Sequence, residues 1–118
     1  MKPSLSPEEI QLIRSQTGGS ILPVAEIGEL AARHKILYLL DACQSVGHLP
    51  IDVAKIKCDM LSATGRKYLR APRGTGFLYI RQSIQDQIKP LLLDFLAAST
   101  VSLTSYTLKN DARKYKLY

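Results

Sequence analysis

The feature that most constrains the fold is an unbroken apolar segment in the first half of the chain, residues 36–40, Ile-Leu-Tyr-Leu-Leu. The segment shows no alternation of apolar and polar residues, and it stops at Asp41. A strand that is apolar on both faces is typical of a parallel sheet with helices covering it. We therefore predict that residues 36–40 form a buried strand of such a sheet.

Helix and strand patterns alternate on either side of this segment, and the connections between them are short. Pro23 opens a helical pattern that ends near residue 35. Two further apolar segments, 60–63 and 77–80, are typical of buried strands. Shorter helices are predicted at 6–14, 51–57 (a helix or an irregular link) and 83–89. This order predicts the α/β class, as a partial three-layer α/β/α sandwich around a parallel sheet.

The sequence after Pro90 carries a weaker structural signal. Residues 99–107 are polar and β-branched, and the chain offers no evident pairing partner for them. The last ten residues are basic and aromatic, and they end on no helix stop or turn. We therefore expect a thin sheet of three strands with exposed edges.

The basic charge of the chain has two interpretations, an anionic ligand or a solvated basic face, and both stay open at this point. Its 118 residues suit one domain, and 16 Lys+Arg against 10 Asp+Glu give a formal charge of +6. Basic clusters attract phosphate, in nucleic acid or in a small ligand. A stretch without acidic residues runs from 66 to 81 and holds Arg66, Lys67, Arg70, Arg73 and Arg81.

Cysteine usage and the N-terminal sequence indicate a cytoplasmic setting. Cys43 and Cys58 are too few for a disulfide scaffold and lie at no metal-ligand spacing. His34 and His48 are expected at a helix end and in a loop, without a metal. No apolar signal segment opens the chain, and no apolar run approaches the ~20 residues of a membrane span. We expect a soluble, cytoplasmic protein that binds no metal.

A carboxylate and an amine follow two of the predicted strands. Asp41 comes directly after the first strand, and Lys67 lies on the loop after the second. Ligands of open α/β sheets bind beyond the carboxyl ends of the strands. Asp41 alone is typical of a turn and Lys67 alone of a solvated surface, but together they suit pyridoxal phosphate. That cofactor needs a lysine for its aldehyde, a carboxylate for its ring nitrogen, and donors for its phosphate.

Two ordered segments of the chain carry a family resemblance. Residues 38–47, Tyr-Leu-Leu-Asp-Ala-Cys-Gln-Ser-Val-Gly, resemble the ring-binding segment of the class V aminotransferases. Residues 62–79, which contain Thr-Gly-Arg-Lys and Gly-Thr-Gly-Phe-Leu-Tyr, resemble the cofactor-lysine signature of the same family. Residues 49–53, Leu-Pro-Ile-Asp-Val, match between them. These fold-type I pyridoxal phosphate enzymes include cysteine desulfurases and isopenicillin N epimerase-like proteins.

The resemblance implies a role for each matching residue. Lys67 would form the Schiff base with the cofactor and move the Cα proton of the substrate. Asp41 would pair with the pyridinium nitrogen, and Gln44 would hydrogen-bond the phenolic oxygen of the ring. Thr64 and Arg66 occupy the positions from which the family contacts the phosphate, so all five residues are predicted to bind cofactor.

The chain departs from the family pattern at two of these loop positions. Arg66 stands where many relatives have His, and Ala71 stands where Gly is usual. Cys43 could be mistaken for a desulfurase nucleophile, but the reactive cysteine of that family lies on a later loop. We interpret Cys43 as a buried or site-lining thiol.

The resemblance also bears on domains, partners and reaction. We expect residues 1–16 to be a divergent N-terminal helix and residues 17–118 to be a partial class V large domain without the small domain. The chain would then be a truncated fragment with little activity alone, from a family whose full-length members form homodimers. The substrate would be an amino acid, and the reaction a transamination, desulfuration, epimerisation or carbon–sulfur cleavage.

A second class of function stays open on the sequence. A non-catalytic basic domain could bind a partner chain, nucleic acid or phosphate through residues 66–81. Residues 73–80 half-match the main strand of an RNA-recognition motif, but Thr75 and Ile80 fill two of its three aromatic positions. Nucleic-acid binding is therefore the weaker prediction.

Overall fold

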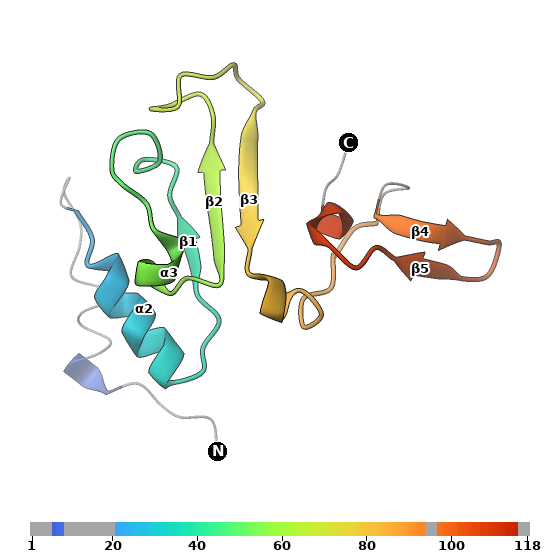
Figure 1. Cartoon of the computed structure of the whole chain (residues 1–118), viewed down its shortest axis with the longest axis horizontal. Coiled ribbons are helices and arrows are strands. Elements are labelled where there is room, and N and C mark those ends of the chain that lie inside the picture. Colours follow the sequence, from blue (N-terminus) through green and yellow to red (C-terminus); the bar gives the residue numbers. More distant parts are fainter. Residues whose placement is uncertain (1–5, 9–20, 94–96, 116–118) are drawn as a thin grey trace. The chain divides into compact units, whose positions relative to one another are not determined.

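The computed structural model describes residues 6–8, 21–93 and 97–115 (Figure 1). The chain divides into two compact units, residues 1–78 and 79–118. Pro7 and Glu8 are helical, as the capping pattern at residue 6 predicts, and most of the predicted helix 6–14 lies outside the described residues. In the described part of the chain, no helix has both the length and the apolar character needed to cross a membrane.

The first unit contains two helices and a sheet. Helix α2 (Val24–Arg33) begins directly after Pro23, as predicted. Helix α3 (Val53–Ile56) lies beside it and begins where the Asp52 carboxylate accepts hydrogen bonds from the backbone N–H groups of Ala54 and Lys55 (Figure 1). Gly28 of α2 contacts the backbone of Ile56 so closely that a methyl group at that position would collide with the Ile56 carbonyl oxygen.

The sheet has the strand order β1–β2–β3, with β1 at Leu39–Asp41, β2 at Met60–Thr64 and β3 at Gly76–Ile80. Strands β1 and β2 are parallel, as predicted, and their register pairs Leu40 with Leu61 and Asp41 with Ser62. Strand β3 points the opposite way to β2 in Figure 1, so the prediction of a fully parallel sheet was wrong. Two parallel neighbouring strands are normally joined by a crossover of a dozen or more residues that contains a helix. The connection between β2 and β3 contains no helix, which fits the antiparallel direction of β3.

The first strand is shorter and more exposed than predicted. Strand β1 starts at Leu39 instead of residue 36, and it includes Asp41. Leu40 is buried, whereas Ile36, Leu37 and Leu39 are exposed. The buried core of this unit comes from both helices, from Leu40 of β1, from alternate positions of β2 and from the residues that follow β1 and α3, namely Leu30, Leu40, Ala42, Ile56, Cys58, Leu61 and Ala63.

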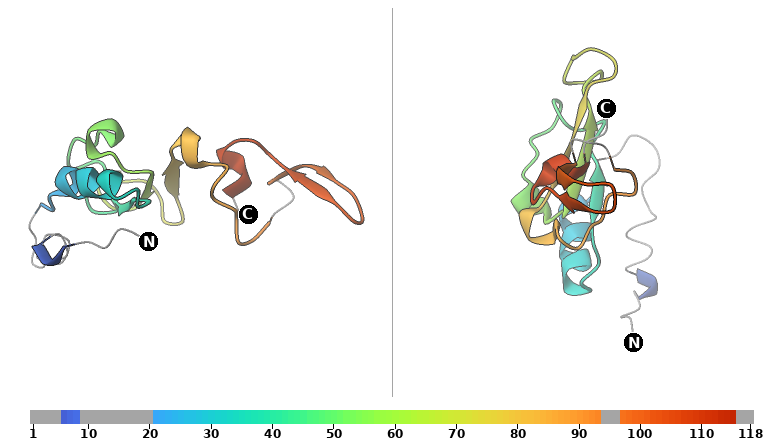
Figure 2. Two further views of the ribbon diagram at one scale, coloured as in Figure 1. Left: turned by 90° about the horizontal axis from the view of Figure 1, so that it is seen from below. Right: turned by 90° about the vertical axis from the view of Figure 1, so that its right-hand side faces the viewer.

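The second unit contains short helices and a hairpin. The predicted helix 83–89 is only a single 3₁₀ turn, η1 (Gln82–Ile84). Residues 99–107, for which we expected no partner, pair with each other: β4 (Ala98–Val101) and β5 (Tyr106–Leu108) are antiparallel, and they lie side by side in both views of Figure 2. A second 3₁₀ turn, η2 (Ala112–Tyr115), ends the described chain.

Candidate functional site

The predicted site residues gather at the carboxyl ends of β1 and β2. Asp41 is the last residue of β1, and Thr64 is the last residue of β2. Because the two strands are neighbouring and parallel, their carboxyl ends lie at the same edge of the sheet. Gln44 follows in the turns after Asp41, and Arg66 and Lys67 lie on the loop after Thr64. Asp41, Gln44 and Arg66 are exposed, and Thr64 and Lys67 are half-buried.

Asp41 takes its electrostatic character from its surroundings. Its Oδ1 accepts a hydrogen bond from the backbone N–H of Cys43, with an N···O distance of 2.9 Å. The Cys43 thiol and this backbone N–H hold the pKa of the Asp41 carboxyl below its ordinary value of 3.8, and the Lys67 ammonium lowers it further. Asp41 is therefore a carboxylate at neutral pH, within electrostatic reach of Lys67.

The loop that carries Lys67 is closed at its base by backbone hydrogen bonds. Gly65 donates to the Thr75 carbonyl oxygen at 2.8 Å, and Ala71 donates to the Gly65 carbonyl oxygen at 2.9 Å. Arg70 donates to the Lys67 carbonyl oxygen, also at 2.9 Å, so Lys67 opens a tight turn. The left-handed backbone of this loop falls on Arg70 (φ 54°) and Gly74 (φ 83°). The alanine at position 71, where the family usually has glycine, therefore meets no conformational conflict.

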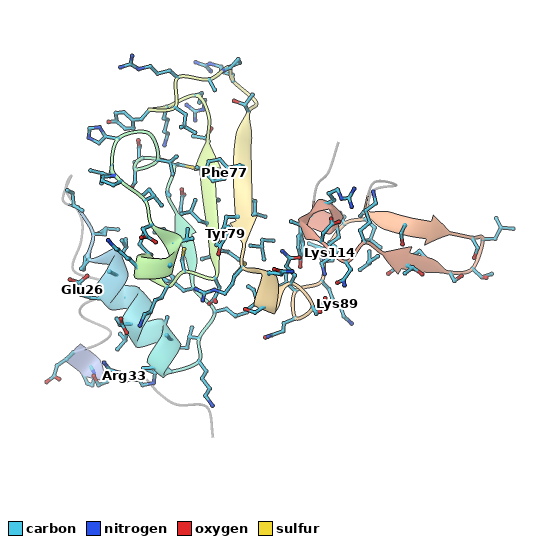
Figure 3. The ribbon with its side chains drawn as sticks, in the orientation of Figure 1. Glu26, Arg33, Phe77, Tyr79, Lys89 and Lys114 are labelled. Atoms are coloured by element: carbon cyan, nitrogen blue, oxygen red, sulfur yellow. The ribbon has the colours of Figure 1, made fainter. Side chains whose placement is uncertain are left out.

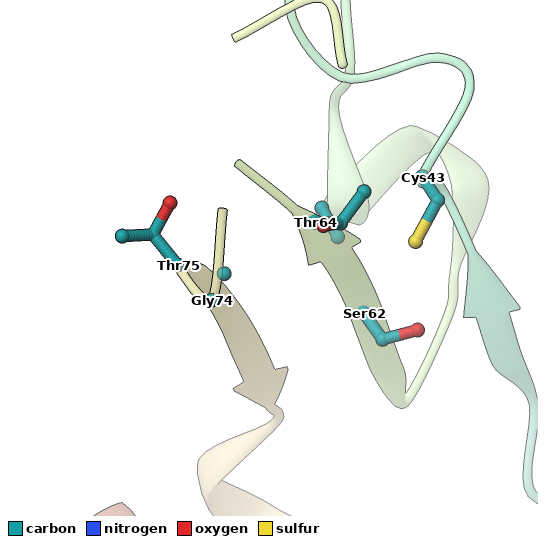
Figure 4. Close-up of a pocket in the computed structure, with 7 residues that line it drawn as sticks. Cys43, Ser62, Thr64, Gly74 and Thr75 are labelled. Carbon is teal, nitrogen blue, oxygen red and sulfur yellow. The ribbon is translucent and has the colours of Figure 1, made fainter. Parts of the chain in front are cut away.

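An open hollow of about 390 Å³ lies beside these residues (Figure 4). Small-molecule sites typically have volumes of about 300–1,000 Å³. The lining comes from all three strands or from the residues next to them: Cys43, Ser62, Ala63, Thr64, Gly74, Thr75 and Gly76. Of the five predicted site residues, only Thr64 lines the hollow, and Asp41, Gln44, Arg66 and Lys67 do not. The half-buried Cys43 has the site-lining position that we expected.

Two features of this region escaped the sequence-based prediction. The side chains of Ser62, in the middle of β2, and of Thr75, directly before β3, join Thr64 around the hollow. The rings of His48 and Tyr68 are stacked, with centroids 4.5 Å apart and planes inclined by 21°. No spacing rule links residues so far apart in sequence, so only the structure could reveal this contact.

The chemistry of these side chains fits pyridoxal phosphate. The Asp41 carboxylate is ionised and exposed, as a partner of a protonated ring nitrogen must be. The hydroxyl groups of Thr64 and Ser62, with Arg66 on the adjoining loop, are donors of the kind that bind a phosphate. The Thr75 hydroxyl instead donates to the Pro72 carbonyl oxygen at 2.6 Å.

Comparisons with known proteins assign the family. The model of the aminotransferase class-V family matches residues 9–117, and the chain belongs to this family. It is 38% identical over 98 residues to a probable cysteine desulfurase of Methanothermobacter thermautotrophicus, covering 83% of this chain and 24% of that protein. It is 46% identical over 74 residues to the cysteine desulfurase IscS of Methanosarcina thermophila, covering 63% of this chain and 18% of that protein.

A solved structure gives the same fold. The apo cysteine desulfurase of Thermococcus onnurineus superposes with a TM-score of 0.74 at 33% identity, covering 80% of this chain and 24% of that one. The chain is therefore a partial α/β fold of the fold-type I class, as predicted. It spans about a fifth to a quarter of the length of these relatives. The family match begins at residue 9, so the division between residues 16 and 17 stays a prediction.

Proposed function

We propose that this chain supplies the lysine and ring-binding part of a pyridoxal phosphate site in an enzyme that acts on an amino acid. The observation that carries the proposal is the shared sheet edge: Asp41 ends β1, and the loop with Lys67 follows the neighbouring parallel strand β2. Family membership supports this function over a non-catalytic basic domain.

In this proposal, Lys67 binds the cofactor covalently. Its amine would hold the cofactor through the cofactor's aldehyde, with loss of water. The cofactor, when bound, supplies an electron sink for negative charge that develops at the Cα of the substrate. The Lys67 amine would also accept and return the Cα proton of the substrate.

Asp41 and its neighbours hold the ring. The ionised carboxylate of Asp41 stabilises the protonated ring nitrogen, because opposite charges close together each favour the charged form. The lowered pKa of Asp41 gives the direction of the pH dependence: the carboxylate is available above its pKa and is lost only as the pH falls through that value. Gln44 donates to the phenolic oxygen, and Thr64 and Arg66 bind the phosphate.

The relatives support further proposals on the substrate and the assembly. Cysteine is the first amino acid to test, since several relatives are described as cysteine desulfurases. We place residues 17–118 in the large domain of the enzyme. We further propose that the whole protein functions as a homodimer.

Borohydride trapping tests the proposal. The chain is incubated with pyridoxal phosphate and reduced with borohydride, and the labelled lysine is located by peptide mass spectrometry. We expect the label to concentrate on Lys67 and to decrease about tenfold in Asp41→Asn, because the loss of a charged partner costs about 1–2 kcal/mol. Lys55→Arg, which removes an exposed lysine of α3, is the matched control and should label like the natural chain. Label scattered over the surface lysines would refute the assignment of Lys67.

A further inference from the structure

The stacked rings of His48 and Tyr68 join the two loops of the candidate site. His48 lies on the segment that follows Asp41, and Tyr68 is the residue directly after Lys67. The centroid distance of 4.5 Å and the angle of 21° are those of a stacked aromatic pair. Both residues are exposed, so the pair contributes little to the buried core of the unit.

Backbone hydrogen bonds fix His48 relative to Asp41. The N–H groups of Ser45 and Val46 both donate to the Ala42 carbonyl oxygen at 3.0 Å, and the N–H of His48 donates to the Ser45 carbonyl oxygen at 2.9 Å. Residues 42–48 therefore form consecutive turns, which leave little freedom between the carboxylate at one end and the imidazole ring at the other.

Gly47 brings the two backbones together at the same place. Its φ of 85° lies in the left-handed region that favours glycine. A methyl group here would lie 2.8 Å from both the carbonyl carbon and the carbonyl oxygen of Tyr68. The segment after Asp41 is thus seated directly on the main chain next to Lys67.

The lysine loop needs such a contact at its tip. The hydrogen bonds between Gly65 and Thr75 and between Ala71 and Gly65 close its base. The backbone hydrogen bond of the turn that starts at Lys67 is donated by Arg70 of the same loop. The stack on Tyr68 ties this turn to the other loop.

We propose that His48 and Tyr68 are positioning residues, whose stacked rings hold the turn of Lys67 in register with Asp41. The inference rests on the proposed function and deepens it: the covalent and the ionic contact with the cofactor must be made by two separate loops at once. A fixed distance between the loops lets the Lys67 amine reach the aldehyde while Asp41 holds the ring nitrogen. In this proposal, His48 acts on Lys67 through its stack on Tyr68.

The test compares borohydride trapping in the full 118-residue chain and in three variants. His48→Ala removes the ring, His48→Phe keeps an aromatic ring without the imidazole nitrogens, and Tyr68→Phe keeps the stack without the hydroxyl. The readout is the share of label on Lys67 relative to the other lysines. We expect about a two- to tenfold decrease in His48→Ala, in line with the strength of an aromatic pair, and near-natural values in the other two variants.

A second measurement follows the loop without the cofactor. Limited digestion with trypsin reports the mobility of residues 66–73, which contain several cleavage sites. His48→Ala should be cut faster in this loop, whereas His48→Phe should be cut at the natural rate. Circular dichroism confirms that each variant is folded.

The outcomes separate the two proposals. Natural labelling of Lys67 that is unchanged in His48→Ala would overturn the positioning role alone. The positioning role would also be overturned if His48→Phe lost as much label on Lys67 as His48→Ala, because an aromatic ring at position 48 would then not be sufficient. Absence of labelling on Lys67 in the natural chain would overturn the proposed function, and the positioning role with it.

Discussion

Two glycines of the candidate site have nearly the same backbone conformation in different surroundings. Gly47 has a φ of 85° and Gly74 a φ of 83°. A methyl group at Gly47 would press against the Tyr68 backbone, whereas one at Gly74 would meet nothing within 4 Å. At Gly74, glycine is favoured by the positive φ alone. At Gly47, it is favoured both by the positive φ and by the close approach of the Tyr68 backbone.

We expect Gly47→Ala to destabilise the chain more than Gly74→Ala. An L-residue in the left-handed region costs about 1–2 kcal/mol, which both variants incur. Gly47→Ala adds the overpacking against Tyr68, about 1–3 kcal/mol more. Urea unfolding followed by circular dichroism measures both free energies of unfolding. Equal decreases in the free energy of unfolding would show that Gly47 does not pack closely against the Tyr68 backbone.

At the scale of elements, the sequence predicted well where local signals were sufficient. The proline before α2 and the apolar pattern of β2 are local signals, and these two elements were found within a few residues. The β4–β5 hairpin was missed because its turn contains no Gly, Asn or Pro. Its turn is held by Ser102, whose Oγ accepts from the Ser105 N–H at 3.0 Å.

The predicted helix 83–89 failed for a non-local reason as well as a local one. Lys89 precedes Pro90, and the proline ring disfavours the helical conformation of the residue before it. The Tyr115 hydroxyl of η2 lies 2.7 Å from the Gln85 carbonyl oxygen and 3.0 Å from that of Ile88. These contacts use carbonyl groups that a longer helix would need, and they depend on a residue far along the chain.

Tyr115→Phe should therefore loosen the second unit. It removes the hydroxyl that the part-buried carbonyl groups of Gln85 and Ile88 share, at a cost of about 1–2 kcal/mol. Amide hydrogen exchange at Gln87, whose N–H donates to the Ile84 carbonyl oxygen, should accelerate about tenfold. The exposed Tyr106 gives the control, since Tyr106→Phe should leave exchange within about 0.5 kcal/mol of the natural value. Equal exchange in both variants would count against the Tyr115 contacts.

At the scale of the whole molecule, the placement of Asp41 and Lys67 at one sheet edge was more predictable than the sheet itself. The positions of Asp41 and Lys67 after neighbouring parallel strands could be predicted because strand ends are local features. The reversed direction of β3 was missed although the helix-free connection before it was a usable signal. The stack of His48 on Tyr68 could not be predicted, since it depends on how two loops meet.

The sheet leaves large apolar side chains uncovered at both of its outer strands. Leu39 of β1 is 54% exposed and Phe77 of β3 is 47% exposed, and Phe77 is labelled in Figure 3. Ile36 and Leu37 extend the exposed apolar surface before β1. Uncovered strand edges and apolar patches of this kind promote association between chains.

We therefore expect the chain to associate with itself as its concentration rises, through the apolar surface around β1. Leu39→Lys should weaken this association about tenfold or more, because removing a buried leucine from a contact costs about 1.5–3 kcal/mol. Leu103→Lys, at a fully exposed position of the β4–β5 turn, is the matched control and should change little. Sedimentation equilibrium over a concentration series measures the association constant, and binding of an apolar dye follows the exposed surface. A chain that stays monomeric at every concentration, or equal effects of the two variants, would show that this surface does not drive association.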